Sequence, residues 1–182
     1  AGAVAQTIFS EEIDLPEDFT PERVVMPPSP LTLQVLFVGG DDIVQTTRTY
    51  GTPAGKAIAK EWNDFIGFTP DNTGESMGWI SVNHEMIYRD DRIGDGGGMT
   101  VFRVERDEIT GLLQPVYQKL EDGREGTFFN VDFANTVGET GMNCGGISSN
   151  FDGRIWTAEE WFRTSTASIY DNNNGVRDTS AF

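Results

Sequence analysis

The sequence has very little of the two residue types that build most transition-metal sites, with one cysteine and one histidine among 182 residues. A single cysteine cannot form a disulfide within the chain. One cysteine and one histidine also cannot supply the four ligands of a zinc finger. Zinc fingers and other metal sites made only of cysteine and histidine are therefore excluded within this chain.

Basic residues are also scarce. The chain has 13 lysines and arginines and 29 aspartates and glutamates, which gives a formal net charge of −16. Nucleic acids and anionic membrane surfaces would repel such a chain. No apolar run approaches the roughly 18 residues that a bilayer-spanning helix needs. The composition therefore predicts no nucleic-acid partner and no transmembrane segment. It fits an exported, salt-tolerant surface or a protein that holds cations.

The residues that are present favour one domain built from many short strands. Hydrophobic residues make up 37% of the chain and aromatic residues 11%, which is enough for a real core. Glycine is abundant, and it occurs in polar turns between short apolar segments. We expect an all-β sandwich, barrel or propeller. The expected strands are 31–38, 79–82, 99–105, 112–118, 127–133 and 154–157.

Three segments fall outside this strand-and-turn pattern. Residues 1–30 contain five prolines and predict an extended N-terminal arm, separate from a domain at 31–182. Residues 54–62 are rich in alanine and lysine and predict one short helix. Residues 63–70 predict an apolar loop with aromatic residues. The small residues at the start of the chain are typical of a terminus left by signal-peptide removal, which predicts export, although a trimmed terminus would look the same.

Polar residues gather in two places. Cys144 is followed by two glycines, and an apolar strand downstream of it ends near Glu159 and Glu160. The second place is the end of the 79–82 strand, where His84 and Glu85 follow directly. Carboxylates at a strand end could hold a metal or substrate. Considered singly, a lone cysteine is more often a buried structural residue, and a lone histidine is more often a hydrogen-bonded one.

A third polar segment, 171–178, has the sequence DNNNGVRD. Its Asp171, Asn173 and Gly175 fit a calcium loop loosely, because such loops place oxygen ligands at alternate positions and a glycine at the sharp turn. The bidentate glutamate of such a loop is missing downstream. The alternative is a metal-free polar turn.

Five segments in order resemble the PhoX-type alkaline phosphatase family. They read NDFIGF, WISVNHE, GGGMTVFRVER, MNCGG and WTAEEWF, and the resemblance runs from about residue 31 to residue 162. The sequence departs from the family between the last two segments. There the family usually has Thr-Pro-Trp-Gly-Thr, and this chain has SSNFDGRIWT.

The resemblance implies a β-propeller that hydrolyses phosphate monoesters outside the cytoplasm, in the periplasm or the extracellular space. It also implies a ferric iron pair with calcium ions. By motif, Cys144 is an iron ligand, and Glu85 and Glu159 are metal ligands. Thiolate and carboxylate groups are anionic ligands suited to a trivalent ion, and hard oxygen atoms suit calcium. The residues that would support these ligands are Asn143, His84 and Glu160.

The length of the chain implies an incomplete propeller. A blade takes about 40 to 45 residues, so this chain would form three to four blades. The resemblance therefore makes it the N-terminal part of a propeller, which a second polypeptide or a missing C-terminal part completes with further ligands. Activity on a phosphomonoester substrate depends on that completion. The alternatives are a non-catalytic, calcium-stabilised propeller subunit of a larger extracellular or envelope assembly, and a small binding module that uses aromatic loops.

Overall fold

The computed structural model describes residues 32–47, 53–86, 92–93, 97–136 and 140–160, together with the backbone of two short strands near the C-terminus. The expected N-terminal arm, residues 1–30, lies outside the described residues. Every regular element in the described part is a β-strand, which confirms the all-β prediction. This part of the chain has no helix long and apolar enough to cross a membrane.

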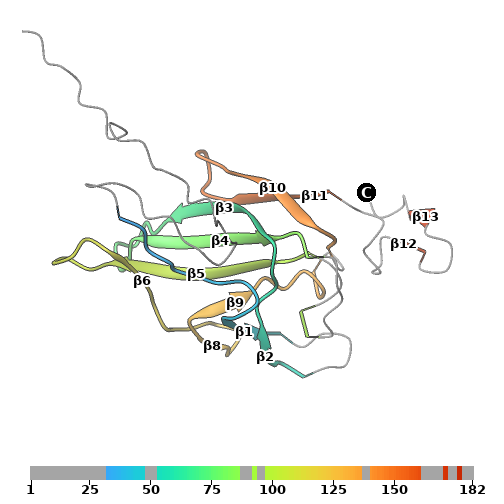
Figure 1. Ribbon diagram of the computed structural model, residues 1–182, viewed down its shortest axis with the longest axis horizontal. Helices are drawn as coiled ribbons and strands as arrows, with labels where there is room; N and C mark the ends of the chain where they lie inside the picture. The colour runs from blue at the N-terminus through green and yellow to red at the C-terminus, as the bar shows by residue number, and fades with distance from the viewer. Residues whose placement is uncertain are drawn as a thin grey trace, which may run out of the picture. The chain divides into compact units, whose positions relative to one another are not determined.

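The largest part of the fold is a mixed sheet of seven strands (Figure 1). Six of them lie in the order β2-β1-β9-β5-β4-β3, and the seventh, β6, pairs with β5. Strands β1 and β9 pair in parallel, and the other described pairs of this sheet are antiparallel. The strands are β1 (Ile43–Thr46), β2 (Gly55–Ile58), β3 (Asn63–Pro70), β4 (Gly78–His84), β5 (Met99–Arg106), β6 (Leu113–Pro115) and β9 (Phe128–Asn130).

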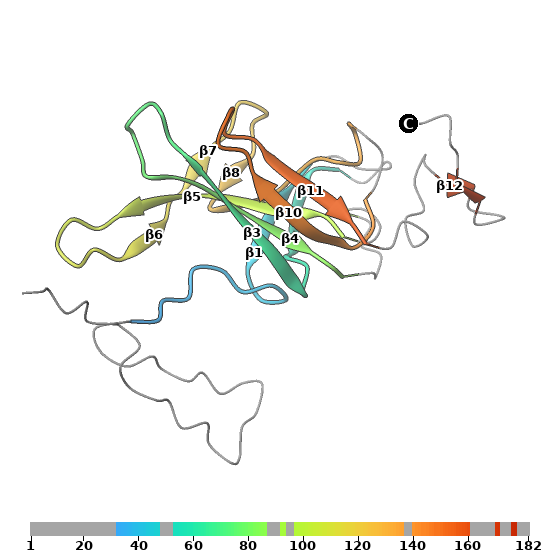
Figure 2. The same cartoon turned by 90° about the horizontal axis from the view of Figure 1, so that it is seen from above.

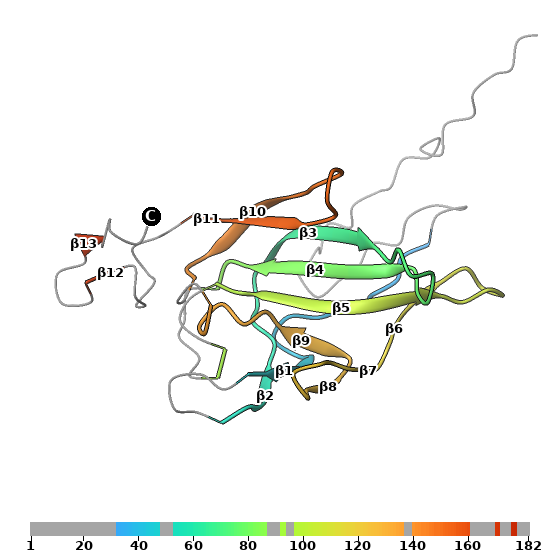
Figure 3. The ribbon, with the colours of Figure 1, turned by 180° about the vertical axis from the view of Figure 1, so that it is seen from behind.

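Three two-stranded sheets accompany the large one, and all the described sheets are open. The hairpin of β10 and β11 lies beside β3 in all three ribbon views (Figures 1, 2 and 3). The strands are β7 (Gln118–Lys119) with β8 (Glu125–Gly126), β10 (Asn143–Ser148) with β11 (Ile155–Glu159), and β12 (Tyr170–Asp171) with β13 (Val176–Arg177).

The hydrophobic core covers one face of the seven-stranded sheet, which we call the core face. Val82, Phe102 and Val104 are buried there, because side chains alternate between the two faces of a strand. Phe37, which precedes the first strand, lies over them, with its ring centroid 5.9 Å from that of Phe102 and 5.3 Å from that of Phe128. Burying an aromatic ring such as Phe102 contributes about 2–3 kcal/mol.

The β10–β11 hairpin covers part of the opposite face, which we call the hairpin face. A β-carbon at Gly67 of β3 would come within 2.7 Å of the Ile155 side chain in β11. The Thr69 hydroxyl donates a hydrogen bond to the Gly153 carbonyl at 2.9 Å. Glycine at position 67 therefore allows the hairpin to pack directly on β3.

The predicted helix at 54–62 is wrong, because residues Gly55–Ile58 form strand β2. Ala57 and Ala59 are buried while Lys56 and Ile58 are exposed, which is the two-residue period of a strand. Ala57 pairs with Val44 in β1 and joins the core beside it. Burial in the sheet thus overrides the helix propensity of the alanines in this segment.

Two further predictions are wrong and several are right. Residues 32–38 form no strand, although Phe37 contributes to the core. The expected loop at 63–70 is strand β3. The predicted strands at 79–82 and 99–105 are confirmed as β4 and β5. The remaining predicted strands at 112–118, 127–133 and 154–157 are found with altered bounds, the first divided between β6 and β7.

Candidate metal centre

Three side chains that could bind a metal ion meet at one end of the hairpin. Asp64, Glu85 and Cys144 each offer one ligand atom, and these atoms all lie within 4.8 Å of one another. We call this group the Asp64–Glu85–Cys144 cluster. Its members come from β3, from the residue after β4, and from β10. Two carboxylates and a thiol at this spacing could hold a single metal ion.

Pairing between β3 and β4 brings the two carboxylates together. Asn63 pairs with His84, and the register shifts between Asn63 and Ile66, so Asp64 lies in an irregular part of the pair. The Glu85 amide donates a hydrogen bond to the Trp62 carbonyl at 2.9 Å. An irregularity of this kind redirects a side chain at a sheet edge, and here it places Asp64 near Glu85.

Two residues with left-handed backbone conformations precede the ligand-bearing strands. Trp62 has a φ of 57° and Met142 a φ of 48°, which is an uncommon conformation for residues other than glycine. The Met142 carbonyl accepts a hydrogen bond from the Glu160 amide at 3.0 Å. The chain therefore turns sharply just before Asp64 and just before Cys144, and hydrogen bonds from neighbouring strands hold both turns.

Buried asparagines fix the position of Cys144. Asn143 is fully buried, and its Oδ1 accepts a hydrogen bond from the Gly98 amide at 2.5 Å while its Nδ2 donates to Thr157 at 3.0 Å. From β4, the Nδ2 of Asn83 donates to the Cys144 carbonyl at 2.9 Å. These contacts tie β10 to the sheet on both sides of the thiol.

The two carboxylates raise the pKa of the Cys144 thiol from 9.0 to about 12. The largest cause is a hydrogen bond from the thiol to Asp64, followed by one to Glu85, and burial and the two negative charges act in the same direction. Without a cation, the thiol therefore keeps its proton at neutral pH.

A multivalent cation at the cluster would take the place of this proton. It would neutralise the negative charge that the three side chains bring together. Two carboxylates and a thiolate together fit an iron site chemically, whereas calcium would use only the carboxylate oxygens.

The structure brings two of the three residues that the sequence indicated as ligands into the cluster. Glu159 lies outside it, and its Oε2 accepts a hydrogen bond from the Gly141 amide at 2.8 Å. Asp64 takes the third place in the cluster. The signal that could identify Asp64 is its place in the NDFIGF segment, but the composition of that segment predicts a loop.

The supporting residues named from the sequence differ in their surroundings. Asn143 is buried beside Cys144, while Glu160 is exposed. His84 is 2% exposed and lies on the core face, where its Nε2 is 2.8 Å from the Thr100 hydroxyl. Burial, with a smaller contribution from Lys60, lowers the pKa of His84 from 6.5 to about 4, so its ring is neutral at physiological pH.

The residues of the expected calcium loop are described only in small part. Asp171 belongs to the backbone of β12, which pairs with β13 in antiparallel fashion. Asn173 lies outside the described residues.

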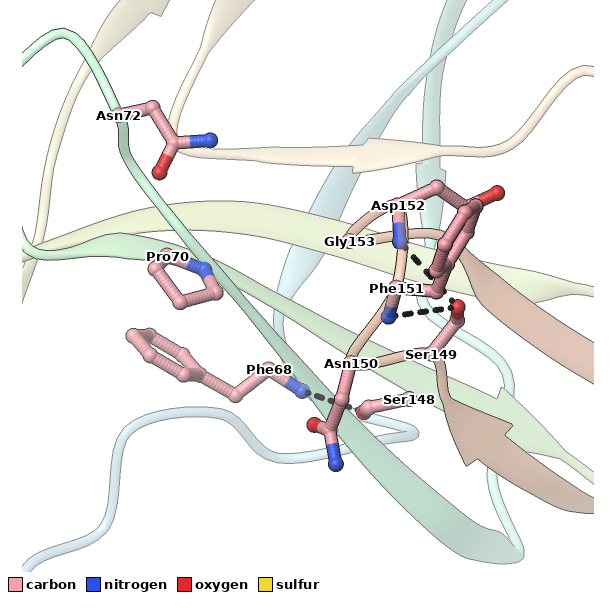
Figure 4. A pocket seen from close by; sticks show the side chains of 9 residues that line it. All are labelled: Phe68, Pro70, Asn72, Ser148, Ser149, Asn150, Phe151, Asp152 and Gly153. Atoms are coloured by element: carbon pink, nitrogen blue, oxygen red, sulfur yellow. Dashed lines mark hydrogen bonds between the residues drawn. The ribbon is translucent and has the colours of Figure 1, made fainter.

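A shallow groove of about 350 Å³ lies at the other end of the hairpin from Cys144 (Figure 4). The turn after β10 forms one side of it and the end of β3 the other. The Ser148 hydroxyl accepts a hydrogen bond from the Phe68 amide at 3.3 Å across the groove, and Phe151 is 99% exposed at its rim. The groove does not include the cluster.

Comparison of the chain with protein-family models, curated proteins and solved structures gave no match. The resemblance to the PhoX-type alkaline phosphatases therefore rests on the five sequence segments, and membership of that family stays a prediction.

Proposed function

We propose that this chain is the N-terminal part of an exported, metal-dependent phosphatase that hydrolyses phosphate monoesters and resembles the PhoX-type enzymes. The observation that carries the proposal is the convergence of Glu85 and Cys144. They come from two segments, WISVNHE and MNCGG, that are distant in sequence and that both belong to the resemblance. A family-like metal site requires these two segments to meet.

The proposed cofactors are iron and calcium. When bound, such ions would polarise the phosphoryl oxygens and activate an oxygen nucleophile. The residues of this chain hold one of these ions through Cys144, Glu85 and Asp64. With a formal net charge of −16, the chain by itself would repel a phosphate dianion. A bound cation would attract the dianion and so allow an anionic substrate to bind.

The proposed architecture is a β-propeller of which this chain supplies three to four blades. The open sheets of the described part are consistent with a ring that a second polypeptide or a C-terminal part of the same protein closes. That part would add further acidic ligands to the same metal site. Secretion to the periplasm or the extracellular space belongs to the same proposal.

Hydrolysis of p-nitrophenyl phosphate by the native protein that contains this chain tests the proposal. We expect activity that a chelator removes and that iron with calcium restores. Cys144→Ser should lose that activity while the protein remains folded. Full activity in the serine variant, or in protein stripped of metal, would contradict the proposal.

The second candidate is a non-catalytic subunit that binds calcium for rigidity. The observation that favours it is the two carboxylates of the cluster, because calcium prefers oxygen ligands. Metal analysis separates the two functions. Iron together with calcium supports the phosphatase, calcium alone supports the structural subunit, and neither metal would favour a small binding module.

A further inference from the structure

Asn83 has a buried carbonyl oxygen that lacks a hydrogen-bond partner. The residue is 0% exposed, and its Oδ1 accepts no hydrogen bond from the described residues. Buried side-chain acceptors are nearly always paired, and an unpaired one costs about 1–3 kcal/mol. A buried oxygen of this kind requires an explanation, and a bound ion or water would supply one.

The orientation of the Asn83 amide is determined by its other atom. Its Nδ2 donates two hydrogen bonds to backbone carbonyls of β10, at 2.9 Å to Cys144 and at 3.0 Å to Gly145. A flipped amide would place an oxygen against these two carbonyl oxygens, which would be repulsive. The unpaired atom is therefore the oxygen.

The Asn83 side chain lies on the same face of the sheet as the cluster. Side chains alternate along β4, and His84 points to the core face, where it contacts Thr100. Asn83 therefore points to the hairpin face, and its hydrogen bonds place the amide against the backbone of Cys144. Two residues further along the chain, Glu85 contributes a carboxylate to the cluster.

We propose that the Oδ1 of Asn83 is a fourth ligand of the cation held by the Asp64–Glu85–Cys144 cluster. This inference rests on the cation site of the proposed function. An amide oxygen is a hard, neutral donor that calcium and other oxygen-preferring ions accept. It adds a ligand without adding charge, so the thiolate and two carboxylates can balance a trivalent ion.

The same contacts would link two strands through the bound ion. Its nitrogen binds the backbone of β10 while its oxygen binds the cation, so the ion joins the end of β4 to the strand that carries Cys144. Cation binding should therefore stabilise the attachment of the hairpin to the sheet as well as fill the site.

Terbium luminescence of the metal-free native protein that contains this chain tests this proposal. Tb³⁺ is a hard trivalent ion that nearby tryptophans sensitise, and its lifetimes in H₂O and D₂O report the number of coordinated waters. We expect Asn83→Ala to bind Tb³⁺ about 10- to 100-fold more weakly than the unaltered chain. The bound ion should hold about one additional water, because water replaces the missing oxygen ligand.

The matched control is Asn130→Ala, which removes another buried asparagine, one in β9 whose Nδ2 donates to the Val131 carbonyl. It should leave both the Tb³⁺ affinity and the water count unchanged. An unchanged water count in the Asn83 variant would overturn the proposal, as would an unaltered chain that binds no Tb³⁺. An equal loss of affinity in both variants would also overturn it, because it would indicate a structural effect.

If the Asn83→Ala chain does not fold, a measurement on the unaltered chain decides. The side-chain carbonyl ¹³C resonance of Asn83 should shift when diamagnetic La³⁺ is added, and an unchanged resonance would overturn the proposal. Phosphatase activity separates this inference from the proposed function. An inactive native protein with an Asn83-dependent Tb³⁺ site refutes the phosphatase alone, whereas an active one with an Asn83-independent site refutes this inference alone.

Discussion

The backbone of Gly146 packs directly against the ring of Phe65, and a β-carbon at position 146 would overlap that ring and lie 2.7 Å from the Trp156 carbonyl oxygen. This contact joins the β10–β11 hairpin to β3. It lies two residues from Cys144 on one strand and next to Asp64 on the other. The close approach of Gly146 and Phe65 therefore allows the thiol and the carboxylate to meet.

Adjacent glycines provide a matched test of this contact. Gly146→Ala should lower the free energy of unfolding by about 1–3 kcal/mol, because the new methyl group overlaps the Phe65 ring and backbone atoms. Gly145→Ala should have little effect, since no atom lies within 4 Å of its β-carbon position. Chemical denaturation of the two variants measures the difference. Equal stabilities would show that the hairpin does not pack on β3 in this way.

Replacing the thiol should separate binding from folding. Cys144 is half-buried, so Cys144→Ser should change the free energy of unfolding by no more than about 1 kcal/mol. The same variant should bind iron much more weakly, because it cannot form a thiolate. Circular dichroism and metal titration are the two measurements. Global unfolding of the serine variant would instead indicate that Cys144 is a structural core residue.

Cation affinity should increase with pH. The pKa of Cys144 is raised to about 12 in the metal-free protein, so a metal ion that binds the thiolate must release one proton. Between pH 6.5 and pH 8.5 the affinity should rise about tenfold per pH unit, because each ion that binds the thiolate releases one proton from Cys144. Iron titration at several pH values measures this slope, and Cys144→Ser should abolish it. A slope that survives in the serine variant would exclude the thiolate as a ligand.

His84 should make the fold sensitive to acid. Its pKa is about 4 in the folded protein and near 6.5 in the unfolded chain, so between these values the unfolded chain binds a proton that the folded protein excludes. The free energy of unfolding should therefore fall as the pH falls from 6.5 to 4, by up to about 3 kcal/mol.

The sequence makes this experiment simple, because His84 is the single histidine and its NMR signal needs no assignment. His84→Gln should show a smaller loss of stability over the same pH range. A measured pKa near 6.5 would mean that the ring is hydrated rather than buried against Thr100.

The sequence predicted the central strands well and their neighbours poorly. Strands β4 and β5 were recognisable because their own residues carry the apolar pattern that the core requires. The pattern of β3 was not recognisable, because Gly67 is buried by Ile155 from a hairpin far along the chain. The sequence of β2 predicts a helix, because its alanines have high helix propensity and pairing with β1 is a tertiary effect.

The candidate site was also predictable only in part. Cys144 and Glu85 were indicated by the two segments that contain them, and the structure places them together. The position of Asp64 depends on the irregular pairing of β3 with β4, which no local pattern encodes. The unpaired oxygen of Asn83 likewise arises only from the packing of the hairpin on the sheet. Their roles as metal ligands remain predictions.

The most direct measurement of the central claim is the metal content of the purified native protein, compared with that of its Cys144→Ser variant by inductively coupled plasma mass spectrometry. The claim is that the Asp64–Glu85–Cys144 cluster holds an iron ion of a phosphatase. We predict iron and calcium in the unaltered protein and a loss of iron in the serine variant. Equal iron in both proteins, or neither metal in the unaltered one, would contradict the claim.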